Sequence, residues 1–190
     1  MNTSADNEVI LQMKGITKEF PGVKALDNAG IELRKGEVHA LLGENGAGKS
    51  TLMKILGGEY SRNAGEVILH GKSVVFRNTD EAQKAGIGFV HQELNLIPQL
   101  SVAENVFLGR EPLSTKFMGL INRKKLVEDT KDVLSRINMD FDPLKPIGEF
   151  SIAHRQMIEL AKTLSLDADI VILDEPTSSL TETEVKELFN

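Results

Sequence analysis

A glycine-rich stretch at residues 43–51 has the residue types and the spacing that bind a phosphate chain. It fits G-x-x-x-x-G-K-[ST] and reads Gly43, Glu44, Asn45, Gly46, Ala47, Gly48, Lys49, Ser50 and Thr51. Gly46 and Gly48 lack a Cβ, so the backbone can wrap closely around phosphate groups. Backbone amides at the start of a following helix would favour an anion. Lys49 adds positive charge for the β- and γ-phosphates, and Ser50 offers a hydroxyl to Mg²⁺. The stretch therefore predicts nucleotide binding.

Two carboxylates follow an apolar run near the other end of the chain. Residues 170–173 are apolar and rich in β-branched side chains, which predicts a fully buried parallel strand. Asp174 comes next and is the expected Mg²⁺ partner opposite Ser50. Glu175 is one residue further on, where it could orient or deprotonate an attacking water. The separation of Lys49 from Asp174 exceeds a simple βαβ crossover, so we expect a whole subdomain between them.

Two further side chains each leave two interpretations open. Phe20 lies in a predicted turn upstream of the glycine-rich stretch, where it could stack on an adenine ring or pack on a sheet. Gln92 follows a predicted apolar strand at residues 87–91. The carboxyl end of such a strand is where ligands meet open α/β sheets, but a solvated loop fits the spacing equally well.

The elements that must position these residues are short strands and helices in alternation. Apolar runs and period-two alternation predict strands at residues 9–16, 29–33, 37–42, 66–69, 73–76, 87–91 and 170–173. Residues 34–36 are expected to close a hairpin into the buried strand at 37–42. Capping residues and 3.6-residue periodicity predict helices at 51–56, from Asn78 or Thr79 to Gly86, at 101–108, at 122–137, from Ser151 onward, and from Thr181 onward.

The helix that Ser151 opens is expected to bury a stripe made of Ile152, Ala153, Met157, Leu160, Ala161 and Leu164. We interpret Met157 as a core residue. His154 is expected at the surface or in a cap, and the four histidines lack metal-ligand spacing.

Composition narrows the function classes. The chain has 190 residues, 41% hydrophobic and 26% charged, which is ordinary for a globular domain. The net charge of −6 argues against a nucleic-acid partner. The absence of cysteine excludes disulfides and thiolate chemistry. Residues 1–8 are polar and predict a disordered tail, and no apolar run in the sequence is long enough to span a membrane. We expect a cytosolic protein or a peripheral membrane subunit.

Taken together, these residues resemble the nucleotide-binding domain of an ABC transporter over residues 9–190. The resemblance implies roles that follow the family's motif order: Phe20 as the A-loop aromatic on adenine, residues 43–51 as Walker A, Gln92 as the Q-loop Mg²⁺ sensor, residues 150–156 as the signature, residues 170–175 as Walker B with Glu175 as catalytic base, and residues 178–181 as the D-loop. It also implies that Lys49, Gln92 and Glu175 serve catalysis. Ser50, Gln92 and Asp174 would hold Mg²⁺.

The signature region departs from the family pattern. The usual wording is Leu-Ser-Gly-Gly-Gln, and here Ile152 and Ala153 replace the two glycines, between Ser151 and His154. The signature acts on the nucleotide of a partner domain through its serine and backbone amides. We therefore expect side chains at 152 and 153 to hinder that close approach.

The sequences of residues 90–96, 151–162 and 174–184 are similar to those in the N-terminal half of the ATP-binding proteins of bacterial monosaccharide importers of the ribose, galactose and allose type. An autoinducer importer of the same subfamily is nearly as similar. The implied fold is α/β, a P-loop NTPase of ABC type with a mainly parallel core, an N-terminal antiparallel β subdomain and an inserted helical subdomain, truncated at its C-terminus. The implied divisions are residues 1–8, 9–94, 95–165 and 166–190.

The implied function is an ATPase that uses ATP and Mg²⁺ to drive sugar import at the cytoplasmic face of the bacterial inner membrane. Its implied partners are a second nucleotide-binding domain, transmembrane permease subunits and, indirectly, a periplasmic sugar-binding protein, with no nucleic acid. One alternative is an ATP-binding fragment without turnover of its own. Another is an ABC ATPase that acts on ribosomes or DNA, against which the negative charge and the importer-like wording argue.

Overall fold

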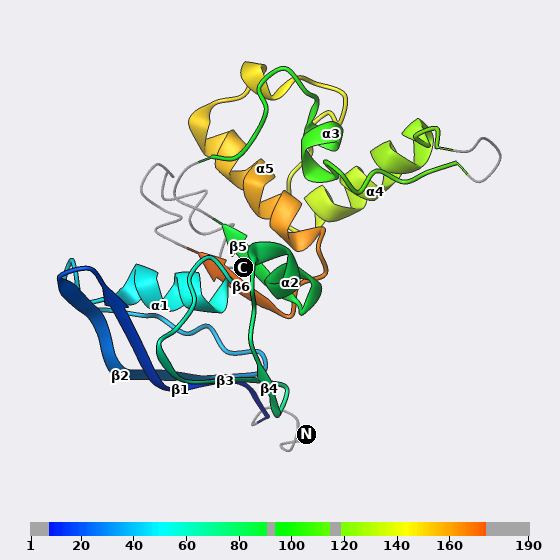
Figure 1. The fold of residues 1–190 in the computed structure, drawn as a ribbon. Helices are drawn as coiled ribbons and strands as arrows, with labels where there is room; N and C mark the ends of the chain where they lie inside the picture. Colours follow the sequence, from blue (N-terminus) through cyan, green and yellow to red (C-terminus); the bar gives the residue numbers. More distant parts are fainter. Residues whose placement is uncertain (1–7, 91–93, 115–118, 174–190) are drawn as a thin grey trace, which may run out of the picture. The chain divides into compact units, whose positions relative to one another are not determined.

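The computed structural model describes residues 8–90, 94–114 and 119–173 (Figure 1). The chain divides into two compact units, one up to Ile87 and one from Gly88 onward. The Walker A stretch lies in the first unit. The signature region and the strand expected to lead into Asp174 lie in the second.

The first unit contains an antiparallel four-stranded sheet in the order β2-β1-β3-β4 (Figure 1). Its strands are β1 (Val9–Phe20), β2 (Val23–Arg34), β3 (Ala64–Leu69) and β4 (Lys72–Val74). Alternate residues of β1 and β3 point into the core, because successive side chains of a strand face opposite sides. Leu11 and Met13 of β1 and Val67 and Leu69 of β3 are buried in this way. Ile10 and Ile16 of β1 are buried as well, and a register shift separates Met13 from Ile16. The N-terminal antiparallel β subdomain is thereby confirmed.

The connection between β2 and the glycine-rich stretch differs from the prediction. β2 pairs with β1, with Phe20 opposite Val23 across a turn, so residues 34–36 form a turn but not a hairpin. Residues 37–42 are not a strand, and Val38 and Leu42 are 85% and 87% exposed. A strand needs a hydrogen-bonded neighbour. Within the described ranges, no strand pairs with this segment, so the predicted buried strand is wrong there.

Two helices complete the first unit. Helix α1 (Lys49–Leu56) begins at the lysine of the loop, two residues before the predicted start, and ends at Leu56 with Gly57 as its C-cap, which confirms the predicted stop. It packs against β2 (Figure 1). Helix α2 (Thr79–Lys84) is capped by Asn78, whose Oδ1 accepts a 2.9 Å hydrogen bond from the Glu81 amide. Gly86 follows with φ of 89°, which confirms it as the helix stop.

Strand β5 (Ile87–Val90) begins at the last residue of the first unit and continues into the second, where β6 (Ile170–Leu173) is its neighbour in a two-stranded sheet. The helices of the second unit are α3 (Val102–Val106), α4 (Arg123–Ser135) and α5 (Ile152–Leu164), with a short 3₁₀ helix, η1 (Ile147–Glu149). α3, α4 and α5 pack on one another. Their shared core is Val90, Val102, Val106, Val133, Leu134, Ile137, Ile147, Met157, Ile158, Leu160 and Ala161.

Helix α5 confirms one prediction and corrects another. Ser151 caps it, and Met157 lies in the core at 2% exposure. Ile152 is 61% exposed, so its predicted place in the buried stripe is wrong. The buried face begins one and a half turns further along, where Ile158 and Ala161 pack inward. After the exposed Ile152, the residues of the first turn are half-buried.

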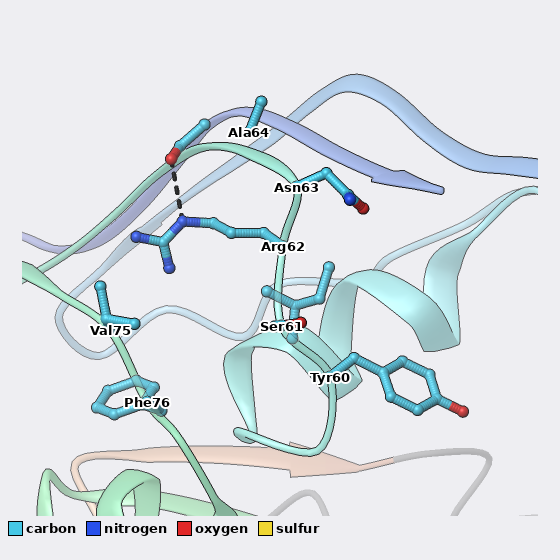
Figure 2. A pocket seen from close by; sticks show the side chains of 9 residues that line it. Tyr60, Ser61, Arg62, Asn63, Ala64, Val75 and Phe76 are labelled. Atoms are coloured by element: carbon cyan, nitrogen blue, oxygen red, sulfur yellow. Dashed lines mark hydrogen bonds between the residues drawn. The ribbon is translucent and has the colours of Figure 1, made fainter. Parts of the chain in front are cut away.

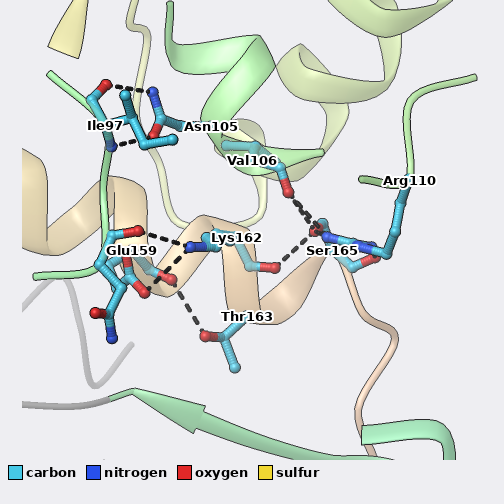
Figure 3. Close-up of polar contacts among 9 residues, drawn as sticks. Ile97, Asn105, Val106, Arg110, Glu159, Lys162, Thr163 and Ser165 are labelled. Atoms are coloured by element: carbon cyan, nitrogen blue, oxygen red, sulfur yellow. Dashed lines mark hydrogen bonds and ion pairs between the residues drawn. The ribbon is translucent and has the colours of Figure 1, made fainter. Parts of the chain in front are cut away.

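Polar contacts attach the segment at residues 95–97 to α3 and α5 (Figure 3). Asn105 on α3 is 1% exposed, and its amide group exchanges two hydrogen bonds with the backbone of Ile97, at 2.7 and 3.0 Å. Lys162 on α5 donates to the Asn95 carbonyl at 3.0 Å. Arg110 donates to the Ser165 hydroxyl at 2.8 Å and so ties the end of α3 to the end of α5. Buried polar groups require such partners.

Within the residues that the structure describes, no helix combines the length and the apolar character needed to cross a membrane.

Candidate functional site

The glycine-rich loop is seated on strand β2 through Gly48. Gly48 has φ of 85°, a left-handed conformation that side chains disfavour. A Cβ at this position would lie 2.6 Å from the Ala25 carbonyl oxygen and 2.6 Å from Leu26 Cδ2. Gly46 has nearly the same φ, 84°, but nothing lies within 4 Å of its Cβ position. Glycine is therefore required at 46 for conformation alone, and at 48 for conformation and space.

Lys49 lies at the centre of the loop. Its Nζ donates to the carbonyl oxygens of Gly43 at 2.6 Å and Glu44 at 2.9 Å. A turn bond from the Ala47 amide to the Glu44 oxygen, 3.1 Å, closes the loop around the lysine. The ammonium group is thus held inside the loop by backbone carbonyls, where phosphate oxygens could replace them.

The N-terminus of α1 offers backbone donors to an anion. The first amides of an α-helix have no partner within the helix. In α1, the N-cap residue Gly48 brings no side-chain hydrogen bond, and the first turn carries no acidic residue to offset the positive end of the dipole. Ser50 is exposed in this first turn. The amides of 49–51 and the Ser50 hydroxyl therefore offer hydrogen-bond donors at the same helix end as one positive charge, the Lys49 ammonium.

Phe20 lies close to this loop along the hairpin. It is the last residue of β1, and Lys18, two residues before it, pairs with Leu26, which contacts Gly48. Two residues of a strand span about 7 Å. The half-buried Phe20 ring meets Tyr60 edge to face, with centroids 5.4 Å apart and planes at 77°, and Lys18 Nζ lies 5.0 Å from the Phe20 centroid. The hairpin therefore connects the Phe20 ring to the glycine-rich loop through the Lys18–Leu26 pair.

Three predicted site residues lie outside the described residues: Gln92, Asp174 and Glu175, together with the D-loop at 178–181. The structure describes the strands that lead to them. β5 ends at Val90 and β6 at Leu173, and these two strands are neighbours. The predicted Q-loop and Walker B residues therefore follow adjacent strands of one sheet.

The signature region forms a capped helix start with an aromatic cluster behind it. Ser151 Oγ accepts a 3.2 Å hydrogen bond from the His154 amide. The His154 ring lies 5.0 Å from Phe141 and 6.2 Å from Phe150, measured between centroids. Ile152 is exposed, as described above, and Ala153 is half-buried. The aromatic cluster was not predicted from the sequence, because Phe141 comes from a segment separate from Phe150 and His154.

A pocket of about 260 Å³ lies between the end of α1 and the start of β3 (Figure 2). Arg62 lines it, but the guanidinium donates to the carbonyls of Gly65 at 3.0 Å and Val74 at 3.2 Å. The guanidinium is thus engaged with backbone acceptors rather than presented to an anion. Figure 2 shows the Tyr60 ring directed away from Val75 and Phe76, on the opposite side of the pocket.

Comparisons with known proteins agree with this arrangement. The family described as ABC transporter matches residues 26–178. The chain is 51% identical over 186 residues to a galactose/methyl galactoside import ATP-binding protein of Clostridium tetani. This alignment covers 97% of this chain and 37% of the relative. The chain is 50% identical over 189 residues to a protein of the same name in Photobacterium profundum, covering 100% and 37%. The chain thus spans little more than a third of these relatives' length.

Solved structures show the same fold. A nucleotide-free ATP-binding cassette of an ABC transporter superposes with a TM-score of 0.82 at 25% identity, over 96% of this chain and 75% of that one. The dimeric structure of a bacterial ABC transporter cassette superposes with a TM-score of 0.77 at 27% identity, over 94% and 79%. With the family match over most of its length, the chain has the α/β fold of these P-loop cassettes and belongs to the ABC transporter family.

Proposed function

We propose that this chain binds ATP at residues 43–51 and, as part of an importer, hydrolyses it to drive the uptake of a monosaccharide. The observation that carries the proposal is the Lys49 ammonium group held inside a glycine loop at the start of α1. A loop of this geometry offers charge and backbone donors to a polyphosphate. The names of the relatives, galactose/methyl galactoside import ATP-binding proteins, favour a sugar as cargo.

Phosphate binding would replace the hydrogen-bond acceptors of the Lys49 ammonium group. In the free loop, Lys49 bonds to the neutral carbonyls of Gly43 and Glu44. Hydrogen bonds between an ammonium and a charged oxygen are roughly twice as strong as those between neutral groups. The β- and γ-phosphate oxygens would therefore replace the carbonyls. The unsatisfied amides at the start of α1 would add further bonds without rearrangement.

The base would stack on Phe20. Lys18 lies over this ring, but an exposed cation–π contact is worth only about 0.5–1 kcal/mol. Base stacking on an aromatic side chain is worth about 1–3 kcal/mol. Because stacking is the stronger interaction, adenine would displace the Lys18 ammonium group from the Phe20 ring.

Hydrolysis would use the residues that follow β5 and β6. In this proposal Ser50, Gln92 and Asp174 would hold Mg²⁺, and the bound ion would supply positive charge to the phosphate chain. Glu175 accepts a proton from a water that attacks the γ-phosphorus in line. The bond from phosphorus to the β,γ-bridging oxygen breaks as the new P–O bond forms, and ADP and inorganic phosphate leave. Lys49 stabilises the charge on the transferred group.

The proposal extends to partners and location. A second nucleotide-binding domain would supply a signature to this chain's nucleotide, and the dimeric cassette among the similar structures supports such pairing. Transmembrane permease subunits would hold the chain at the cytoplasmic face of the inner membrane, and a periplasmic binding protein would deliver the sugar. We propose residues 9–94 as β subdomain and loop core, 95–165 as helical subdomain, and 166–190 as the Walker B segment and the start of the next helix.

Calorimetry with Mg-ATP on Lys49→Ala tests the binding proposal. A hydrogen bond to a charged group is worth about 1.5–3 kcal/mol, so affinity should fall roughly 10- to 100-fold. Lys84→Ala is the matched control, since it removes an exposed lysine that pairs with Asp80 on α2, away from the loop. The control should bind as the wild type does. Equal affinity of Lys49→Ala and wild type would refute the assignment.

A further inference from the structure

Tyr60 is the one tyrosine of the 190 residues, and it contacts Phe20 directly. The two rings meet edge to face, an arrangement that aromatic pairs prefer and that fixes one ring plane against the other. Lys54 Nζ lies 5.5 Å from the Tyr60 centroid, and Lys54 belongs to α1. Tyr60 therefore lies between the helix that begins with Lys49 and the ring proposed to receive the base.

The backbone holds Tyr60 firmly to the end of α1. The amides of Glu59 and Tyr60 both donate to the Lys54 carbonyl, at 2.9 and 3.2 Å. Gly58 adopts φ of 77°, and a Cβ there would overlap the Asn78 carbonyl. The turn thus has one tight conformation, and it carries the Tyr60 ring as a fixed extension of the helix.

The segment after Tyr60 is joined to the end of β1. The Asn63 amide donates to the Thr17 carbonyl at 2.8 Å, and Asn63 Oδ1 accepts from the Glu19 amide at 2.8 Å. Glu19 is the residue before Phe20. Hydrogen bonds therefore hold the backbone near both rings, at Glu19 directly before Phe20 and at Asn63, three residues after Tyr60.

We propose that Tyr60 is a positioning residue for the adenine ring of the nucleotide. It holds the Phe20 ring in one orientation and connects it to the helix that carries the phosphate-binding lysine. This inference rests on the proposed ATP binding at residues 43–51. Loss of an aromatic pair of this kind corresponds to a roughly two- to tenfold change in an equilibrium constant.

Two substitutions and two ligands test this role by calorimetry. Tyr60→Leu should weaken Mg-ATP binding roughly two- to tenfold and leave the binding of Mg-tripolyphosphate, which has no base, within twofold of wild type. Tyr60→Phe keeps the ring and should restore Mg-ATP affinity. An unchanged Mg-ATP affinity in Tyr60→Leu would overturn the inference. So would an equal loss for both ligands, since that would mean Tyr60 supports the loop rather than the base.

Intrinsic fluorescence gives a second readout on the unmodified side chain, because the chain has no tryptophan. Mg-ATP should change the Tyr60 emission more than Mg-tripolyphosphate does, after correction with free tyrosine for absorption by the nucleotide. Phe20→Leu should abolish the difference. Equal responses to both ligands in the wild type would contradict the role of Tyr60 but leave the proposed ATP binding standing. If the wild type binds neither ligand, the proposed function fails as well.

Discussion

Replacing Gly48 by alanine tests how the phosphate-binding loop is seated on β2. Gly46 and Gly48 have almost the same left-handed backbone, with φ of 84° and 85°. They differ in surroundings, because the Cβ position of Gly46 is open while that of Gly48 lies 2.6 Å from both Ala25 O and Leu26 Cδ2. Gly46→Ala is therefore a matched control that shares the conformational cost without the overlap.

The magnitude follows from these two contributions. An alanine in the left-handed region costs about 1–2 kcal/mol at either position. Overpacking a closely packed site typically costs a further 1–3 kcal/mol, and here one of the overlapped atoms belongs to the backbone of β2, which cannot rotate away. The free energy of unfolding of Gly48→Ala should therefore lie about 1–3 kcal/mol below that of Gly46→Ala. For a chain of this size, that corresponds to a Tm roughly 2–12 °C lower.

Thermal unfolding followed by circular dichroism measures this difference, and calorimetry with Mg-ATP shows whether the loop still binds. Gly48→Ala should be the less stable protein and the weaker binder. Equal Tm values for the two variants would show that Gly48 does not lie against β2 as described. Leu26 would then not connect the loop to the hairpin that ends in Phe20.

Three further outcomes are expected. Glu175→Gln in the full-length protein should keep Mg-ATP affinity and lower phosphate release by about 10²–10⁴, and turnover within a few-fold of wild type would exclude Glu175 as the base. Glu104 accepts bonds from the Ser101 hydroxyl and amide, which lower the pKa of its carboxyl below the ordinary 4.5. Its stabilisation is below about 1 kcal/mol because solvent still reaches the half-buried carboxylate. This stabilisation is present above the ordinary pKa and is lost as pH falls through the folded pKa, so the Tm gap between wild type and Glu104→Gln should be largest near neutrality and close in acid. Glycine at both 152 and 153 should lower the Tm, since each glycine costs a helix about 1 kcal/mol, but leave Mg-ATP affinity unchanged, because a signature acts on the partner's nucleotide.

Features set by neighbouring residues could be predicted from the sequence. Asn78, Ser101 and Ser151 each cap the helix assigned to them, because a side-chain cap satisfies amides only two or three residues away. The stop of α1 at Gly57 and the start of α1 at the loop also depend on local chemistry. The glycine-rich loop can be predicted for the same reason, because its lysine and glycines lie within nine consecutive residues, 43–51.

Features set by distant neighbours could not be predicted. The apolar run at 37–42 has the pattern of a buried strand, but a strand forms only where another strand pairs with it, and the described residues provide none. Ile152 fits a helical stripe by spacing, yet the first turn of α5 lies outside the packed core. Tyr60 carries no motif at all. Its contact with Phe20 depends on the turn after α1 and on the hydrogen bonds of Asn63, which no periodicity reveals.

One hairpin supports both ends of the proposed nucleotide site. β2 supplies Ala25 and Leu26, against which Gly48 lies, and β1 ends in Phe20, which the same hairpin places about two residues further along. The hairpin does not depend on residues 37–42 for its hydrogen bonds, since β2 pairs with β1 and β1 pairs with β3. In the proposed site, the antiparallel sheet would therefore set the distance between the base and the phosphates. A substitution that shifts the register of β1 against β2 should change affinity for ATP more than affinity for tripolyphosphate, whereas a change within 43–51 should affect both alike.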